Sequence, residues 1–157
     1  MKIFLIRHGE TTGDVEDRYG GGGYDDSLTQ TGIEQVTHTA QQLRDKGIQI
    51  IFSSPLKRAS ESANIIAQIV GCSIEYVGPL KERIKGVIQG LTKQEALERY
   101  PDVVALHDNV HNTLPGGEPF EDFKKRVVES FGHITQSSYD TVAVLTHAGP
   151  IMRILAH

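Results

Sequence analysis

The chain has a single cysteine, Cys72, among its 157 residues, so it cannot form an internal disulfide framework and it fits a reducing compartment. It has no excess of basic residues: the formal net charge is −4, which argues against the broad basic face that nucleic-acid binding needs. It also lacks an apolar run of membrane-spanning length, and Arg7 and His8 interrupt the short N-terminal run before a signal-peptide core is complete. We expect a cytoplasmic protein that binds neither nucleic acid nor membranes.

A P-loop is also missing. Residues 10–30 contain four successive glycines, Gly20–Gly23, but no Gly-Lys-Ser/Thr follows them. Four glycines in a row are unfavourable in a helix and poor in a strand, so we expect a mobile surface segment. Two interpretations stay open for it, a plain flexible loop and a lid over the neighbouring strand end.

Hydrophobic periodicity predicts strands that alternate with helices. The expected strands cover residues 3–6, 48–53, 72–77 and 140–145, and the expected helices cover residues 31–46, 55–70, 92–100, 118–136 and those from 150 onward. We expect a loop at residues 79–90 and an irregular stretch between Pro101 and Pro119. This order is typical of a parallel sheet covered by helices. We expect an α/β fold of three layers, α/β/α, with a mostly parallel central sheet in one domain, residues 1–157.

Three of the predicted strands end in residues suited to binding anions. The first ends at Arg7-His8, the second leads through Ser54-Pro55 to Arg58, and the last ends at His147. The carboxyl ends of parallel strands meet at one edge of a sheet, where ligands bind in open α/β folds. Ser54 is expected to cap its helix, with Pro55 in the first helical position. Arg58 then lies in the first turn, where the macrodipole disfavours a cation, so a bound anion is expected to offset that cost.

These side chains suit a phosphoryl group. Arginine offers forked donors that match phosphate oxygens, and a helix beginning near Pro150 adds free backbone N–H groups beside His147. One histidine can attack phosphorus if nearby guanidinium groups keep its imidazole neutral, and the other can donate to the equatorial oxygens. A carboxyl group must protonate the leaving alkoxide, and Glu82 follows the third predicted strand at the same edge. Considered alone, Glu82 would be interpreted as an ordinary loop acid.

Several blocks of the sequence resemble the histidine phosphatase superfamily, which includes cofactor-dependent phosphoglycerate mutases and broad-specificity phosphatases. The blocks are Leu-Ile-Arg-His-Gly-Glu-Thr at residues 5–11, Ser-Ser-Pro-Leu-Lys-Arg-Ala at 53–59, Pro-Gly-Gly-Glu at 115–118 and Leu-Thr-His-Ala-Gly at 145–149. The resemblance covers nearly the whole chain, and several blocks in the right order are a stronger signal than a lone Arg-His-Gly. It implies a phosphoglycerate mutase-like fold.

The resemblance also implies a role for each site residue. His8 would be the phosphorylated nucleophile, Arg7 and Arg58 would bind phosphate, and His147 and Glu82 would be the second histidine and the proton donor. Asp14 stands where mutases tend to have an asparagine that contacts the substrate phosphate. An anionic side chain there would repel phosphate unless it faces away or is protonated. The Asp-Phe-Gly-like run that usually follows the acid in this family is replaced by Ile84-Lys85-Gly86-Val87.

Family members usually continue for another strand and helix beyond the position of His157, where this chain ends. We therefore expect a truncated or unusually short member that lacks the C-terminal strand and helix. In such a chain Ile151, Ile154 and Leu155 would be exposed and would offer a route to dimerisation, so the expected state is a monomer or a homodimer.

The expected function is that of a metal-independent phosphomonoester hydrolase that needs no cofactor and acts on a small phosphorylated substrate through a phosphohistidine intermediate. One alternative is phosphoglycerate mutase-type transfer, although the chain lacks room for the insertions that the resemblance implies for mutases. The other is a non-catalytic phosphate-binding regulatory module. His107 and His111 could share a helix face as metal ligands, but their neighbours Asp108 and Asn109 indicate a loop, so no metal site is expected.

Overall fold

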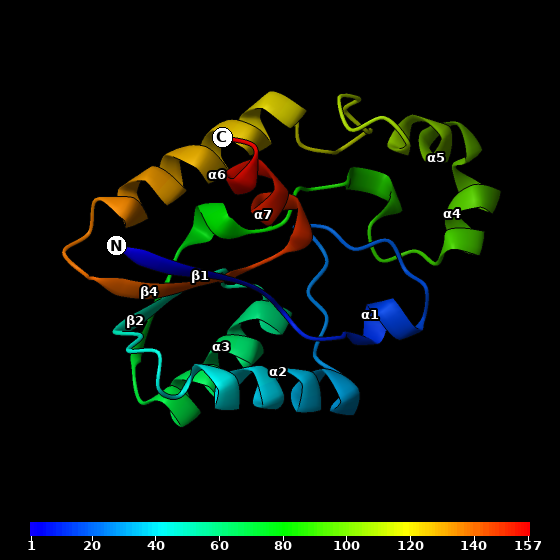
Figure 1. Ribbon diagram of the computed structural model, residues 1–157. Helices are drawn as coiled ribbons and strands as arrows, with labels where there is room; N and C mark the ends of the chain where they lie inside the picture. Colours follow the sequence, from blue (N-terminus) through cyan, green and yellow to red (C-terminus); the bar gives the residue numbers. More distant parts are fainter.

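The computed structural model describes all residues from 1 to 157. At its centre lies a sheet of four strands: β1 (Lys2–Arg7), β2 (Ile50–Ser53), β3 (Ser73–Tyr76) and β4 (Thr141–Thr146). The strands lie in the order β1-β4-β2-β3, and every neighbouring pair is parallel. Helices cover both faces of this sheet (Figure 1), which confirms the predicted three-layer α/β/α architecture.

The two faces of the sheet are covered by different helices. Helices α2 (Gln30–Leu43) and α3 (Lys57–Val70) lie on one side, and α6 (Phe120–Thr135) and α7 (Ala148–Leu155) lie on the other (Figure 1). Successive side chains of a strand point to opposite faces. In β4, Ala143 and Leu145 therefore pack in the cluster with α2 and α3, whereas Val142 and Val144 pack in the cluster with α6. Burial on both faces explains why β4 is an almost continuous apolar run.

Local capping sets where α2 and α3 begin. Thr29 is the N-cap of α2, and its hydroxyl accepts a hydrogen bond from the Gly32 N–H at 3.0 Å. Helix α3 begins at Lys57, so the predicted start at Ser54-Pro55 was wrong. The Lys57 N–H donates instead to a carboxylate oxygen of Asp25 at 2.6 Å. A side chain from a distant loop thus satisfies a free amide at this helix start.

The segment between β3 and β4 is more helical than predicted. It contains two short 3-10 helices, η1 (Gly78–Leu80) and η2 (Gly86–Ile88), followed by α4 (Lys93–Arg99) and α5 (Pro101–His107). Helix α5 contradicts the irregular stretch expected after Pro101. Proline ends one helix because it has no N–H to donate, yet it suits the first position of the next, where no donor is needed. A further short helix, α1 (Thr12–Val15), lies in the loop after β1.

The last helix is docked on the molecule. Helix α7 begins at Ala148, two residues earlier than expected. Ile154 is 8% exposed and packs with Phe120, Phe123 and Val127 of α6, so its predicted exposure was wrong. Leu155, at 73% exposed, does face solvent. None of the helices is long and apolar enough to cross a membrane.

The carboxyl ends of three strands meet at one edge of the sheet, as predicted. Arg7 pairs with Thr146 across β1 and β4, and Ser53 pairs with Leu145 across β2 and β4. The hydrogen bonds continue for one more residue, because the His8 N–H donates to the Thr146 carbonyl at 3.2 Å and the Ser54 N–H donates to the Leu145 carbonyl at 2.9 Å. The residues that follow the three strands therefore emerge side by side.

Leu80 attaches the segment that carries Glu82 to this sheet. Its side chain is 0% exposed in the cluster with Ile50 and Phe52, and its carbonyl accepts a hydrogen bond from the Thr146 hydroxyl at 2.6 Å. We expect Leu80→Ala to lower the free energy of unfolding by roughly 2–5 kcal/mol, because the deletion leaves a cavity. Urea denaturation measures this change. Leu97→Ala, at a position 58% exposed on α4, is the matched control, and equal losses in the two variants would contradict the anchoring role.

Candidate active site

His8 follows β1 directly, and its ring lines a cavity of about 210 Å³ together with Arg7, Arg58 and Glu82. Its Nδ1 lies 2.8 Å from the Gly9 carbonyl oxygen. A carbonyl can only accept a hydrogen bond, so Nδ1 carries the proton and Nε2 keeps its lone pair. Gly9 leaves no room for a side chain, because a Cβ there would overlap the Gly32 carbonyl of α2.

The pKa of His8 lies at about 4, below its ordinary value of 6.5. Burial is the largest cause, and the Gly9 hydrogen bond opposes it. The guanidinium groups of Arg58 and Arg7 lower the pKa as well, whereas Asp14 raises it. The predicted effect of the arginines is therefore present, but desolvation contributes more. The imidazole is neutral at pH 7 and can act as a nucleophile.

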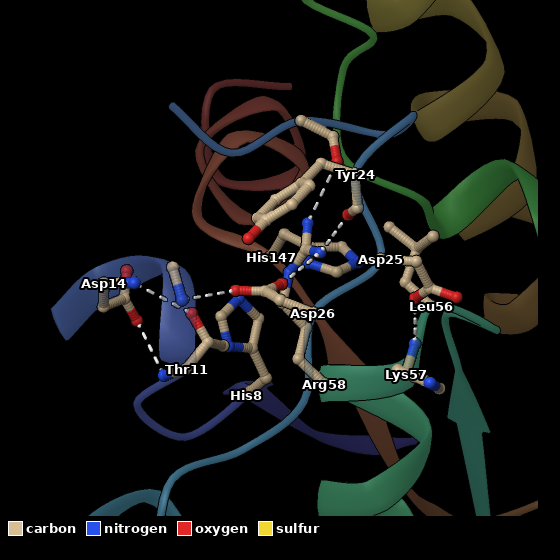
Figure 2. Close-up of polar contacts among 12 residues, drawn as sticks. His8, Thr11, Asp14, Tyr24, Asp25, Asp26, Leu56, Lys57, Arg58 and His147 are labelled. Carbon is tan, nitrogen blue, oxygen red and sulfur yellow. Dashed lines mark hydrogen bonds and ion pairs between the residues drawn. The ribbon is translucent and has the colours of Figure 1, made fainter. Parts of the chain in front are cut away.

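His147 lies behind His8 at the start of α7 and is 1% exposed. The two rings are 5.1 Å apart between centroids, and Figure 2 shows them lying beside Arg58. Burial is again the largest cause that lowers the pKa of His147, to about 2, and Arg58, His8 and Arg7 contribute in the same direction. One ring nitrogen, Nδ1, is buried without a hydrogen-bond partner in the protein.

Ser54 orients His147, a role that its predicted position as a helix cap did not suggest. The Ser54 hydroxyl lies 2.8 Å from His147 Nε2 and accepts a hydrogen bond from the Leu56 N–H at 3.3 Å. A hydroxyl that already accepts from Leu56 has its proton free for Nε2. When this hydroxyl proton goes to Nε2, the imidazole proton of His147 lies on Nδ1, the nitrogen that has no partner.

Arg58 is buried in the first turn of α3, where the sequence predicts a bound anion. Its guanidinium donates to the Asp26 carboxylate at 3.1 Å and to the carbonyls of Tyr24 at 2.7 Å and Gly21 at 3.3 Å (Figure 2). Asp26 also accepts from the Gly13 N–H of α1 at 3.1 Å. Sequence reasoning missed Asp26, because nothing in the sequence separates it from the exposed Asp25 beside it.

The glycine run packs against the wall of the cavity. The Gly22 N–H donates to the Arg83 carbonyl at 2.9 Å, and the Gly23 N–H donates to the Gln89 side chain at 2.9 Å. A Cβ at Gly22 would overlap the Glu82 carbonyl. This close packing explains the glycine at position 22, whereas a Cβ at Gly20 would meet no other atom. The expected mobility of the segment stays a prediction. Gly20 and Gly21 line the cavity, so the run forms part of its wall.

Asp14 lines the same cavity, but its carboxylate forms a hydrogen bond with the neighbouring backbone. One of its oxygens accepts a hydrogen bond from the Thr11 N–H at 3.0 Å, while the Asp14 N–H donates to the Thr11 hydroxyl at 3.2 Å (Figure 2). The two residues form a capping box at the start of α1. The structure thus supplies a structural reason for an acid at a position that the sequence associates with substrate.

Glu82 meets the N-terminus of α7. Its two carboxylate oxygens accept hydrogen bonds from the Arg83 N–H at 2.8 Å and the Gly149 N–H at 3.0 Å. Gly149 is needed for this approach, since a Cβ there would overlap the carboxylate. The carboxyl group therefore reaches the cavity from a fixed position, although the residues after it depart from the family pattern.

Two arginines brace the segment around Glu82. Arg83 donates to the carbonyls of Val110, Asn112 and Glu118. Arg126 on α6 donates to the Glu82 carbonyl at 3.1 Å and forms an ion pair with Glu118 at 2.6 Å. The segment Pro115–Glu118, which resembles a family block, thus supports Glu82 through the contacts of Glu118 with these two arginines. Sequence reasoning did not assign Arg83 or Arg126 a place at the site.

Of the other predicted residues, Arg7 lines the cavity and has no ion-pair partner in the protein. His107 is the last residue of helix α5 and its ring packs on Tyr19 at 5.0 Å, whereas the loop expected at Asp108 and Asn109 is confirmed. The His111 ring packs on a different aromatic residue, Phe120, at 4.7 Å. No group of three or more His, Cys, Asp or Glu side chains is arranged to hold a metal ion.

The sequence profile of the histidine phosphatase superfamily (branch 1) matches residues 3–157. The chain belongs to this superfamily. A metal-independent phosphoserine phosphatase of Arabidopsis thaliana is 32% identical over 159 residues, which cover 98% of this chain and 66% of that protein. A Salmonella paratyphi B protein named "Probable phosphoglycerate mutase GpmB" is 35% identical over 132 residues, which cover 81% of this chain and 60% of that protein. The chain therefore spans less than two thirds of the length of these relatives.

A solved structure agrees with the sequence comparison. The mycobacterial glucosyl-3-phosphoglycerate phosphatase Rv2419c, in complex with VO3, superimposes with a TM-score of 0.84 at 26% identity. The alignment covers 97% of this chain and 77% of that structure. The family and the fold predicted from the motif blocks are confirmed.

Titration at acid pH shows whether the His8 imidazole is neutral in the folded protein. In the folded protein we expect its imidazole to titrate with a midpoint near pH 4 in NMR spectra, against about 6.5 for the same residue in the urea-unfolded chain. The unfolded chain binds this proton first as the pH falls, so the folded state loses stability from about pH 6.5 down to about pH 4. A folded-state midpoint near 6.5 would show that desolvation does not keep His8 neutral.

Proposed function

We propose that this protein is a metal-independent phosphomonoester hydrolase that acts on a small phosphorylated metabolite through a phosphohistidine intermediate, with residues 1–157 as one histidine phosphatase domain. The observation that carries the proposal is the free lone pair of a neutral His8 in a cavity shared with two arginines and Glu82. The phosphatase names of two relatives in the same superfamily support it. The single cysteine and the acidic net charge support a cytoplasmic location without nucleic-acid partners.

In the first step, His8 Nε2 attacks phosphorus while Arg7 and Arg58 hold the phosphoryl oxygens. The bond from nitrogen to phosphorus forms as the bond from phosphorus to the ester oxygen breaks, and Glu82 donates its proton to the departing alkoxide. Positioning and charge stabilisation dominate such transfers, and the guanidinium groups supply both. Asp26 holds Arg58 in place for this contact.

In the second step, water attacks the phosphohistidine and Glu82, now a carboxylate, accepts the proton of that water. Inorganic phosphate leaves and His8 regains its lone pair. His147 is proposed to donate its Nδ1–H to a phosphoryl oxygen in both steps, which would give this buried group the partner that it lacks in the protein. A neutral donor here adds no further positive charge that the two arginines would repel.

Phosphoglycerate mutase-type transfer is the second candidate, because one relative carries that name. Both reactions form the same phosphohistidine and differ in its fate. A hydrolase passes the phosphoryl group to water, and a mutase returns it to the substrate.

The hydrolase is tested with p-nitrophenyl phosphate in the presence of EDTA, together with acid-sensitive labelling of the enzyme. We expect turnover and a trapped phosphoenzyme in the wild type, and neither in His8→Ala, because the attacking nitrogen is gone. His38→Ala, on the exposed side of α2, is the matched control and should keep both. Labelling that survives His8→Ala would remove His8 as nucleophile, and phosphate binding without turnover would favour a regulatory module.

The role of Glu82 is tested by the leaving group. In Glu82→Gln we expect alkyl phosphates to slow by roughly 10²–10⁴-fold, since their alkoxides need a proton, whereas p-nitrophenyl phosphate slows far less. Glu121→Gln at an exposed site of α6 controls for the loss of a charge. Steady-state kcat with both substrate types gives the comparison, and equal slowing would assign the proton to another group.

A further inference from the structure

A second cavity adjoins the one that holds His8. It has a volume of about 390 Å³ and lies between the segment after Glu82, the loop after α5 and helix α7. Glu82, Lys85 and Ala148 line both cavities. The group that would protonate the leaving alcohol therefore stands at the boundary, and the second cavity lies where that alcohol would extend.

Lys85 at this boundary has no anionic partner. Its ammonium group forms no hydrogen bond or ion pair, and the side chain is partly buried. Burial is the largest cause that lowers the pKa of Lys85, and the charges of Lys93 and Arg83 act in the same direction. Glu82 opposes them, but its two oxygens are already held by backbone amides. A partly desolvated cation without a partner is unfavourable unless a ligand supplies the opposite charge.

Arg153 on α7 also faces this cavity without an acid to pair with. Its guanidinium lies over the Phe120 ring at 5.2 Å, and its Nε is buried without a hydrogen-bond partner. The contact with the ring and the position in the last turn of the helix explain part of its placement. They leave the buried Nε unexplained.

The other residues that line the second cavity leave it with an excess of positive charge. Arg83 also lines it, but that guanidinium is used by three backbone carbonyls and serves the loop. The only acid besides Glu82 is the exposed Asp108, and the other walls include the apolar Ile84, Leu114 and Phe123. Lys85 and Arg153 both have hydrogen-bond donors without an acceptor, and they share the cavity with apolar side chains. This combination suits a ligand with an anionic group on a short carbon skeleton.

We propose that this second cavity binds the leaving-group part of the substrate, and that Lys85 and Arg153 bind a second anionic group on it, a carboxylate or a second phosphate. The inference rests on the proposed hydrolase and narrows its substrates to phosphomonoesters of acidic alcohols. Neutral alcohols of the same size would leave both cations without a partner and would react more slowly.

Matched substrate pairs test the inference. 3-Phosphoglycerate and glycerol 3-phosphate differ by a carboxylate in place of a hydroxymethyl group, and propane-1,3-diol bisphosphate and its monophosphate differ by a second phosphate. We expect kcat/KM to favour the anionic member of at least one pair by about tenfold or more, the size of one charge-assisted hydrogen bond. Whichever pair shows the preference identifies the anion. Equal values within both pairs would overturn the inference.

Variants then assign the preference to the two cations. Lys85→Met should lower kcat/KM more for the anionic member than for the neutral one, and Lys85→Arg should restore much of the difference. Arg153→Met should act in the same direction. Lys81→Met, an exposed position in the same segment, should keep the wild-type preference. A proportional loss for both members in Lys85→Met would mean that Lys85 serves the transferred phosphoryl group alone.

A binding measurement keeps the inference separate from turnover. In His8→Ala the substrate stays intact, so calorimetry can compare the affinities of 3-phosphoglycerate and glycerol 3-phosphate, and those of the two propanediol phosphates. Tighter binding of an anionic member, weakened by Lys85→Met in the same background, supports the second cavity even if the wild type turns nothing over. Turnover of p-nitrophenyl phosphate with no preference in kinetics or binding would overturn this inference and leave the hydrolase standing.

Discussion

The parallel pairing of β4 with β1 and β2 is the constraint on which the rest of the structure depends. Because all three strands run in one direction and end in register, the residues after them are delivered to one edge within a few ångströms of each other. Ser54 can then reach His147 although 93 residues separate them. A shift of β4 by one residue would turn its side chains to the opposite faces and separate these groups.

Burial sets the chemistry of the two histidines. Both imidazoles stay neutral mainly because they are withdrawn from water, and the arginines add to the effect. The Gly9 carbonyl fixes the tautomer of His8, because a carbonyl can only accept a hydrogen bond, and the Ser54 hydroxyl holds one ring nitrogen of His147. Next to His8 the positive charge therefore lies on the guanidinium groups of Arg7 and Arg58, while the proposed nucleophile remains uncharged.

The acid is held by contacts from three different elements, which are the segment after β3, the start of α7 and helix α6. Leu80 attaches its segment to the sheet, Gly149 admits the carboxylate to the start of α7, and Arg126 ties the backbone of Glu82 to α6. The departure from the usual family run after Glu82 leaves this support intact. It also places Lys85, in the altered run, at the wall shared by the two cavities.

The sequence by itself determined the alternation of strands and helices and the convergence of Arg7, Arg58 and His147, because buried parallel strands are apolar runs and their carboxyl ends share an edge. Only the tertiary structure decided the contacts between loops. The Asp26–Arg58 pair and the packing of the glycine run join residues that no periodic pattern relates. The docking of Ile154 depends on how α7 lies against α6, and the ammonium group of Lys85 is left without a partner. Such contacts depend on how loops close over the sheet, which local sequence preferences do not specify.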